Sequence, residues 1–597
     1  MQASVFSDVF AQIESRYNSS HSLTSIHDFG AHAAAISILN KGIDVTKQFL
    51  HTLLTRRNSH LPIFILPPEI LARIFHLLVL DEPLLLGRRN LGWIGVTHVC
   101  WHWRQVALDD SSLWARIRGT TVNTKWILEL LVRAKNVPLD IEFNLNTVMR
   151  ASPEKLLIIL PHLSHTRHLR FHGLSKPHFD DVQEICSLEA PALEYFELTA
   201  ITKFSMTFRD LGENMLFKGH SPRLRTLSLS RVVIPWSIIP RGQLTHLKIA
   251  YFDEDVHSPG DLNQLIDLLV NCPALEILAL ESCLPSQLAE FPHGQTIHLP
   301  HLSHLHLCDS TPRISNMLKM FKLPSSTTLH LDCIPSITSN GSEGLLLPVI
   351  SAQLQTPTTV EFKSLAATIG YFWASSLRII ASTSPPALRD HQTQKFGGDI
   401  EGNAKLVLSF NMQLGSGRTN DLFEQACKML PISNLEFISV SAINTTDAID
   451  INWVELFSCC PNVSTMLVNG HGTSSLVQAL TAPTVTNAGS SRELKGRWKW
   501  KCDDRESTLV QPVSTMEHVH AGIFPKLKIL GLTDLDFSEG KHPSNILFNV
   551  LERGLQQRMA ASGAPLKLLR IIDCDICAEY ISNLKKLVQD FQLEGWI

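Results

Sequence analysis

Histidine is the residue type of this chain with the clearest capacity for chemistry, because an imidazole can bind a metal ion or move a proton near neutral pH. The chain contains 27 histidines. The two densest runs are His162, His165, His168 and His172, and His298, His301, His304 and His306. A zinc site needs three or four side chains converging at about 2.0–2.1 Å from the ion, and no cysteine at zinc-finger spacing accompanies either run. A solvated sheet surface therefore explains both runs better than a metal site.

Other motifs of catalysis are incomplete in this sequence. Cys574 and Cys577 form a C-x-x-C, a pattern of redox enzymes and zinc sites, but no second pair accompanies them. Neither a G-x-S-x-G nucleophile elbow nor an H-E-x-x-H zinc motif occurs. We therefore predict a non-catalytic protein with no catalytic residue, no metal and no cofactor.

Charge and composition limit the partners of the chain. Among its 597 residues 18% are charged, the net charge is −4, and no basic run occurs, so we expect no nucleic-acid partner. No run of 18 apolar residues and no basic, apolar leader occurs, so we expect neither a membrane span nor a secretory signal. The 12 cysteines are dispersed rather than arranged as a disulfide framework. A cytoplasmic or nuclear location, or both, is the resulting prediction.

The elements that must position any site begin with a helix. Residues 1–30 are polar and mixed, and we expect a loose tail there. Residues 31–59 show helical spacing of apolar residues, which a short coiled coil would also require. Gly42 and Thr46 interrupt that spacing, which favours a plain helix packed against the next domain. The apolar positions are Ile36, Leu39, Ile43, Leu50 and Leu53.

The stretch between Leu66 and Trp114 holds the most distinctive pattern. Pro67 and Pro68 can open a helix, because the first turn does not use their missing N–H groups, and Glu69 complements the helix dipole there. One broad apolar face follows at helical spacing, formed by Ile70, Leu71, Ile74, Phe75 and Leu78.

Two further helices complete this stretch. The second presents an apolar face, and a third starts at Asp110 or Ser111, either of which can cap it. Three short helices bury only a modest core. The large apolar residues are therefore either the core of a bigger domain or, in part, a surface completed by a partner. They are Val96, Val99, Cys100, Trp103 and Val106 in the second helix, and Leu113 and Trp114 in the third.

The motifs L-P-x-E-I-L-x-x-I-F, V-C-x-x-W-R and L-W in this stretch resemble the F-box, the adaptor-binding module of SCF-type ubiquitin ligases. The departure is a long spacer between residues 81 and 93. The resemblance places an F-box-like domain at residues 60–118 and implies that it binds a Skp-family adaptor, and through it a cullin. The implied adaptor-binding residues are Leu66, Pro67, Ile70, Leu71, Ile74, Phe75, Val99, Cys100, Trp103, Leu113 and Trp114.

A second pattern, L-x-x-L-x-L-x-x-apolar, recurs from residue 119 to residue 597 and alternates with amphipathic helices. Adjacent copies are spaced by about 20 to 31 residues, which brackets the period of leucine-rich repeats. In each L-x-L the leucines share one strand face and the middle residue faces the other way. The L-x-L leucines of the clearest copies, with their substitutes, are Phe196 and Leu198, Leu227 and Leu229, Leu247 and Ile249, Leu278 and Leu280, Leu305 and Leu307, Ile438 and Val440, and Leu530 and Leu532.

One such unit cannot bury its apolar face alone, so stacked units must share a core. The array resembles the degenerate leucine-rich repeats that follow an F-box in fungal-type F-box proteins. Irregular insertions are expected at residues 336–405, around one short strand at 360–362, and at residues 481–521. The predicted fold class is α/β: a short N-terminal helical F-box-like domain, then a leucine-rich-repeat-like α/β solenoid.

The resemblance implies a substrate-recognition subunit of an SCF-type ubiquitin ligase, which holds an unidentified protein substrate on its repeats. The alternative is a leucine-rich-repeat scaffold or co-regulator without a ligase role. The middle residues of the L-x-L strands should line up on the exposed sheet face. This row is our predicted substrate-binding surface, although it could equally be merely solvated. It comprises Arg170, Glu197, Ser228, Lys248, Ala279, His306 and His330.

Overall fold

The structure is a computed structural model of the 597-residue chain. The chain divides into two compact units, Met1–Leu169 and Arg170–Ile597. Among the described helices, none is both long and apolar enough for a membrane span. The described residues are 11, 15, 29–81, 92–118, 124–145, 154–201, 215–251, 261–285, 296–334, 343–355, 360–371, 375–386, 403–411, 416–443, 451–470, 476, 479–480, 523–534, 544–562, 565–574, 576 and 578–595.

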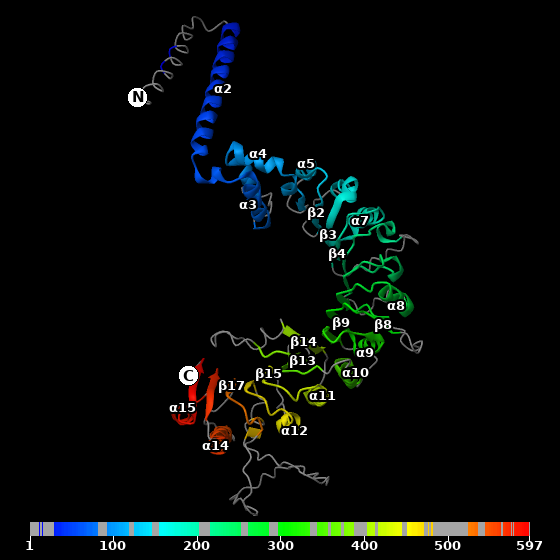
Figure 1. Cartoon of the computed structure of the whole chain (residues 1–597), viewed down its shortest axis with the longest axis vertical. Coiled ribbons are helices and arrows are strands. Elements are labelled where there is room, and N and C mark those ends of the chain that lie inside the picture. The colour runs from blue at the N-terminus through cyan, green and yellow to red at the C-terminus, as the bar shows by residue number, and fades with distance from the viewer. Residues whose placement is uncertain are drawn as a thin grey trace, which may run out of the picture. The chain divides into compact units, whose positions relative to one another are not determined.

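The first unit is helical at its start and then forms a small α/β segment (Figure 1). Strands β1 and β2 pair in parallel, with Ile117 opposite Ile141, and both residues are fully buried. The unit ends within β3. Its elements are α2 (Phe29–Ser59), the 3₁₀ helices η1 (Pro62–Ile65) and η2 (Gly92–His98), α3 (Pro68–Asp81), α4 (Trp101–Asp109), η3 (Ser111–Trp114), β1 (Arg116–Arg118), α5 (Thr124–Ala134), β2 (Leu139–Asn144), α6 (Glu154–Leu157), η5 (Leu160–His165) and β3 (Thr166–Leu174).

The helix predicted at residues 31–59 is present as α2, but its apolar side chains are not packed away. Ile36 is 58% exposed, Ile43 50% and Leu50 54%. The expectation of a helix packed along the next domain is therefore wrong for these side chains. Helical propensity and apolar spacing together predict a helix, but they do not say whether another element lies beside it.

The second unit alternates strands with helices. In chain order it contains η6 (Lys176–His178), α7 (Phe179–Cys186), β4 (Tyr195–Ala200), η7 (Leu216–Gly219), β5 (Thr226–Ser230), η8 (Trp236–Ile238), β6 (His246–Ala250), α8 (Leu262–Val270), β7 (Ile277–Glu281), β8 (Ile297–His298), β9 (His304–Ser310), α9 (Thr311–Met320), β10 (Phe321–Lys322), β11 (Thr328–Ile334), η9 (Glu343–Leu345), α10 (Leu346–Gln355), β12 (Ser364–Tyr371), β13 (Ser375–Ser382), β14 (Ala404–Asn411), α11 (Ser416–Met429), β15 (Phe437–Ile443), α12 (Trp453–Phe457), β16 (Thr465–Asn469), β17 (Ile529–Thr533), α14 (Ser544–Ser562), β18 (Leu566–Ile572), α15 (Ala578–Lys585) and β19 (Val588–Glu594).

Most successive long strands of this unit are parallel neighbours in one large sheet. The pairs β4–β5, β5–β6, β6–β7, β7–β9 and β9–β11 are parallel, and so are the pairs from β15 to β19. Helices α8 to α12 lie along one side of the strands (Figure 1). This is the order that a strand–helix repeat produces when each unit stacks on the one before it.

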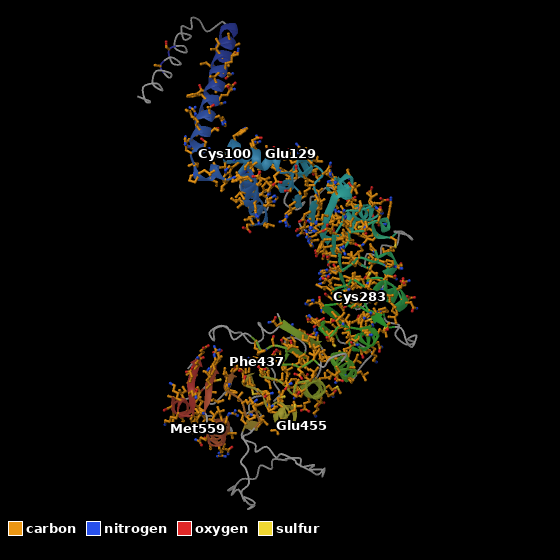
Figure 2. All side chains as sticks on the ribbon, in the orientation of Figure 1. Cys100, Glu129, Cys283, Phe437, Glu455 and Met559 are labelled. Carbon is orange, nitrogen blue, oxygen red and sulfur yellow. The ribbon has the colours of Figure 1, made fainter. Side chains whose placement is uncertain are left out.

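The strand positions and the burial predicted for the L-x-L leucines are confirmed. Leu227, Leu278 and Leu305 are at most 1% exposed, and each stands beside the equivalent residue of the next strand. Cys283, which ends one copy of the pattern, is 1% exposed (Figure 2). Its Sγ donates to the carbonyl oxygen of Ile249 at 3.6 Å. The apolar positions of the pattern therefore build the core between sheet and helices.

The stretch expected to be an irregular insertion, residues 336–405, contains regular elements among its described residues, and for these the expectation is wrong. It holds α10, β12, β13 and the start of β14, while the strand expected at residues 360–362 lies instead at Ser364–Tyr371. Strand β13 runs antiparallel between β12 and β14. Strand β14 pairs in parallel with β11, and β12 with β15. The Ser- and Pro-rich composition indicated turns and so concealed the strands of this stretch. The insertion predicted at residues 481–521 lies outside the described residues.

Candidate functional site

The start of α3 follows from its prolines, as the sequence predicts. The backbone N–H of Leu71 donates to the carbonyl oxygen of Pro67 at 3.1 Å, so Pro68 occupies the first helical position, where no N–H is required. Glu69 lies in the first turn, where its carboxylate complements the helix dipole. The local sequence therefore determines the residue at which α3 begins.

One side of α3 builds the core of the helical segment. Leu71 and Phe75 are fully buried, and Val79 is 7% exposed. Their spacing of four residues aligns them on one side of the helix. The ring of Phe75 lies 5.3 Å from the ring of Trp103, centroid to centroid, which packs α3 against α4.

A different side of α3 presents apolar side chains to solvent. Ile70 is 46% exposed, Ile74 37% and Leu77 58%. These positions follow the i, i+4, i+7 spacing of one helical stripe. The single broad face predicted from the sequence is thus two stripes, one buried and one exposed. We call Ile70, Ile74 and Leu77 the α3 stripe.

The second predicted helix is divided in the structure, because Cys100 is extended and caps the N-terminus of α4. Its sulfur accepts from the backbone N–H of Trp103 at 3.5 Å. The residues on either side of the cap are exposed, Val99 by 59% and Trp101 by 64%. Ile65 of η1, which precedes α3 in the chain, is 82% exposed as well. The apolar stretch around the cap therefore supplies surface as well as core.

Trp114 closes the core of the helical segment. It is 1% exposed, and its Nε1 donates to the carbonyl oxygen of Ala107 at 2.7 Å. The ring of Trp93 meets it edge-on with centroids 4.9 Å apart, and the guanidinium of Arg133 lies 4.5 Å from the ring centroid. Leu113 is equally buried. The predicted L-W motif is thus a structural anchor.

A polar latch joins α3 to η3. Asp110 caps η3 as predicted, and its Oδ1 accepts from the backbone N–H of Ser112 at 3.0 Å. Its Oδ2 lies 3.0 Å from Nε2 of His76 on α3. Burial raises the pKa of Asp110, but the hydrogen bonds from Ser112 and the nearby His76 outweigh burial and hold the pKa below its usual value. The ionised carboxylate is the form that this arrangement stabilises.

The structure separates the residues that the F-box resemblance implied for adaptor binding. The exposed apolar residues Ile65, Leu77 and Trp101 were not predicted as part of this surface, although continuing the spacing of Ile70 and Ile74 by one turn would have reached Leu77. Of the implied residues, Pro67, Ile70, Ile74 and Val99 are exposed, Leu66, Cys100 and Trp103 are half-buried, and Leu71, Phe75, Leu113 and Trp114 are buried.

The predicted row of outward-facing residues is present in the second unit as a register of aligned strand positions. Glu197 stands opposite Ser228, and Ser228 opposite Lys248. Ala279 follows Lys248, and the row continues through His306 to His330. Arg170 lies on β3, with its guanidinium 4.6 Å from the ring centroid of Tyr195. The alignment predicted from the L-x-L pattern is confirmed from Glu197 to His330, whereas the binding role of the row stays a prediction.

The row was predicted to end at His330, but the strand register continues beyond it. Val407 of β14 stands opposite His330, Ile380 opposite Val407, and Ala366 opposite Ile380. These three apolar residues are only 5–6% exposed. Beyond Ala366 the register runs through Ser439, Leu467 and Gly531 to Arg570 of β18. The apolar residues of β12 to β14 therefore interrupt the charged positions of the row rather than end them.

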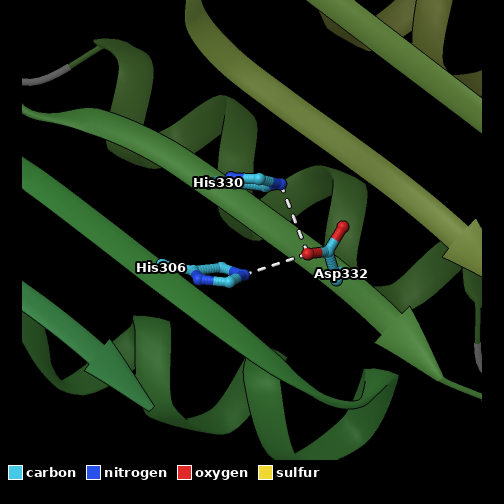
Figure 3. Close-up of side chains that lie close together, drawn as sticks. All are labelled: His306, His330 and Asp332. Carbon is cyan, nitrogen blue, oxygen red and sulfur yellow. Dashed lines mark hydrogen bonds and ion pairs between the residues drawn. The ribbon is translucent and has the colours of Figure 1, made fainter. Parts of the chain in front are cut away.

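Two histidines and an aspartate meet on this face. Nε2 of His306 lies 2.9 Å from Oδ2 of Asp332, and Nε2 of His330 lies 3.3 Å from the same oxygen (Figure 3). The two imidazoles stack with centroids 4.4 Å apart. We call His306, His330 and Asp332 the His–Asp cluster. Asp332 was not predicted, although it lies two residues beyond His330 and so on the same strand face.

Acidic groups surround this cluster. Oε1 of Glu281 lies 3.6 Å from Nδ1 of His306 and 3.1 Å from Nζ of Lys248. Burial raises the pKa of the Cys308 thiol to about 12, and the charges of Asp332 and Glu281 act in the same direction. Burial also raises the pKa of Asp332 itself, but hydrogen bonds from the two histidines and Ser409 outweigh it and leave that pKa well below its usual value.

Most histidines of the two runs do not converge on a common point with two other possible metal ligands. His162 and His165 contact each other at 3.4 Å, and burial lowers the pKa of both. His168 lies 3.9 Å from Asp140. His304 is exposed, and its Nδ1 lies 2.8 Å from the hydroxyl of Ser303. Among the described residues, only the His–Asp cluster brings three possible metal ligands together. Cys577, the second member of the C-x-x-C, lies outside the described residues.

Comparison with known protein families identifies part of the first unit. Residues 63–119 match the F-box-like family. The match spans α3, α4 and η3, the elements that carry the α3 stripe, the Cys100 cap and the Trp114 anchor. No curated protein matches the chain. The chain therefore carries an F-box-like domain.

Proposed function

We propose that this chain, through its F-box-like domain, is the substrate-recognition subunit of an SCF-type ubiquitin ligase. The domain binds a Skp-family adaptor, which connects the chain to a cullin, and the second unit binds a protein substrate. The chain itself is not catalytic. Its contribution to the reaction is proximity, because a bound substrate lysine reaches a high effective concentration near the ubiquitin carrier.

The α3 stripe is the observation that carries this proposal. Ile70, Ile74 and Leu77 are large, apolar and exposed at helical spacing, and they lie within the matched residues 63–119. Scattered exposed apolar residues need no explanation, but an ordered apolar stripe on a helix is what a partner's groove recognises. Leu71 and Phe75 then support the surface from beneath rather than contacting the adaptor.

The decisive test is adaptor capture by a double variant. Ile70→Glu with Ile74→Glu places two charges in the stripe, and co-expression with a Skp-family adaptor should then yield no co-purified adaptor. Both side chains are more than a third exposed, so the fold should survive the change. Val132→Glu is the matched control, because Val132 is 72% exposed on α5 and lies outside the matched residues.

The two outcomes separate the ligase role from the alternative. Loss of adaptor in the double variant, with full capture by Val132→Glu and by the wild type, supports the ligase role. Adaptor capture that the double variant retains, or a wild type that captures none, would favour a scaffold or co-regulator whose F-box-like domain only packs internally.

We further propose that the second unit is a leucine-rich-repeat-like solenoid that binds substrate along the row of outward-facing strand residues from Arg170 to His330. We call this row the polar row. The strand–helix order and the register from Glu197 to His330 support this assignment. Arg170→Glu with Lys248→Glu reverses two charges on the row and should reduce the proteins captured by proximity labelling under proteasome inhibition, without loss of adaptor. Lys322→Glu reverses an exposed charge on β10, away from these strand positions, and serves as the control. An unchanged set of labelled proteins would exclude the row.

A further inference from the structure

The donor atoms of the His–Asp cluster are close enough to share one ion. One ligand atom from each of His306, His330 and Asp332 lies within 4.8 Å of the other two. Two atoms bound to the same zinc ion are at most about 4.2 Å apart, since each bond is about 2.1 Å long. The two histidine–aspartate distances, 2.9 Å and 3.3 Å, already satisfy this limit. Small side-chain rotations would bring the third pair within it.

The strands hold these side chains in place. His306 and His330 stand opposite each other on the paired strands β9 and β11, and Asp332 follows on β11. Both imidazoles turn their Nε2 atoms toward the same carboxylate (Figure 3). A site on adjacent strands of a packed sheet is more rigid than one on loops. The convergence therefore belongs to the fold itself.

The second nitrogen of His306 also has the partner that a metal-binding histidine needs. Its Nδ1 faces the carboxylate of Glu281 at 3.6 Å. When an ion replaces the hydrogen bond from Nε2 to Asp332, a carboxylate in that position favours the tautomer with its proton on Nδ1, and the Nε2 lone pair then binds the ion. Lys248 in turn contacts Glu281 at 3.1 Å and fixes its orientation.

The exposure of the cluster leaves room for a further ligand. The side chains of His306, His330 and Asp332 are 27%, 38% and 21% exposed. Three protein ligands with one open position differ from a closed structural zinc site, which has four. Two imidazoles and one carboxylate suit late first-row divalent ions, whereas calcium and magnesium prefer oxygen ligands.

We propose that His306, His330 and Asp332 bind one divalent transition-metal ion of the zinc class on the exposed sheet face, with one coordination position open. Glu281 is a positioning residue for His306. A protein segment that lies along the row and supplies a histidine, cysteine or carboxylate would complete the coordination. The proposed metal site does not depend on adaptor binding. If the chain proves to bind no metal ion here, the proposed function of the F-box-like domain is unaffected.

Zinc titration of the purified full chain, in competition with a chromophoric chelator, tests the site. The wild type should bind one zinc ion that His330→Ala and Asp332→Asn lose, with affinity reduced more than about 100-fold, and Glu281→Gln should weaken binding by about 10-fold. His304→Ala is the matched control, because it removes an exposed imidazole from the same strand without touching the cluster. It should bind zinc like the wild type. Calcium and magnesium should not compete.

Two measurements keep the result unambiguous. Far-UV circular dichroism shows whether each variant is folded, and the half-exposed His330 is the variant least able to disturb the sheet. Cobalt(II) bound by the wild type should give visible absorption bands that are absent from Asp332→Asn. Zinc binding that is equal in wild type, His330→Ala and Asp332→Asn would reveal adventitious binding by other histidines or cysteines and would overturn the proposal. A wild type that binds no zinc would show that the cluster is a hydrogen-bonded network only.

Discussion

The α3 stripe and the polar row are both the outward sides of elements whose inward sides build a core. Helix α3 buries Leu71 and Phe75 and exposes isoleucine and leucine, whereas β9 buries Leu305 and Leu307 and exposes histidine. An apolar surface gains affinity from buried area, about 1.5–3 kcal/mol for a large aliphatic side chain that becomes fully buried. A polar surface selects its partner by charge and geometry instead.

This difference suggests a division of roles. A surface that binds through apolar area suits one constant partner, such as an adaptor shared by many receptors. A surface that binds through ion pairs or a metal suits a partner that must be discriminated from others. The affinity of a partner for the α3 stripe should therefore depend little on salt concentration, whereas the affinity of a partner for the polar row should fall as salt is added.

The largest expected effect concerns the residue that closes the core of the helical segment. Trp114→Ala removes a fully buried ring, its hydrogen bond to Ala107 and its contact with Trp93. Removal of a buried aromatic side chain typically costs about 3–5 kcal/mol, which would unfold the helical segment or leave it marginal. Hydrogen exchange of residues 63–118 should rise to that of an unfolded chain, and adaptor capture should be lost with it. Protection that persists in Trp114→Ala would mean that the segment has another core.

The next effect contrasts the two faces of a single strand. Leu305→Ala removes a side chain that is 1% exposed and should cost about 2–5 kcal/mol. His306→Ala, one residue further on, removes a half-buried side chain from the outward face and should cost much less. Chemical denaturation of the two variants measures the difference. Equal losses of stability would contradict the assignment of inward and outward faces.

Much of this contrast could be predicted from the sequence, because it depends on local periodicity. The L-x-L pattern assigned the buried leucines and the aligned row correctly, since residues alternate between the two faces of a strand. The F-box motif located α3, Cys100 and Trp114. These features need only spacing along the chain.

Features that depend on contacts between distant residues could not be predicted in this way. The division of α3 into a buried and an exposed stripe depends on where α4 packs. The antiparallel strand β13 lies between strands that are far apart in sequence. The His–Asp cluster needs the register between β9 and β11, and Asp332 carries no motif of its own. Composition concealed the strands of residues 364–382, since serine and threonine suit turns as well as edges.

A smaller effect tests the polar latch between His76 of α3 and Asp110, which caps η3. The folded state lowers the pKa of Asp110, so its ionised form contributes stability at neutral pH that is lost as the pH falls below the usual aspartate value of about 3.9. Asp110→Asn can still cap η3 but carries no charge, and should lose this part of the pH dependence. Asp110→Ala also removes the cap, at a typical cost of about 1 kcal/mol. Thermal unfolding at pH 7 and at pH 2.5, on either side of the usual aspartate value, distinguishes the variants. An unchanged pH dependence in Asp110→Asn would exclude this carboxylate as its source.

The variants with the smallest expected effect on stability separate a role in the fold from a role in binding most clearly. Leu77 and Val132 are 58% and 72% exposed on α3 and α5, and replacing either with alanine should change the free energy of unfolding by less than about 0.5 kcal/mol. Only Leu77 belongs to the α3 stripe. Leu77→Ala should therefore weaken adaptor binding by roughly tenfold, as expected when an apolar contact worth more than about 1 kcal/mol is truncated. Val132→Ala should leave the affinity unchanged. Calorimetry of adaptor binding to both variants measures this directly. Equal affinities would show that α3 contributes its buried side to the fold and nothing from its exposed side to the partner.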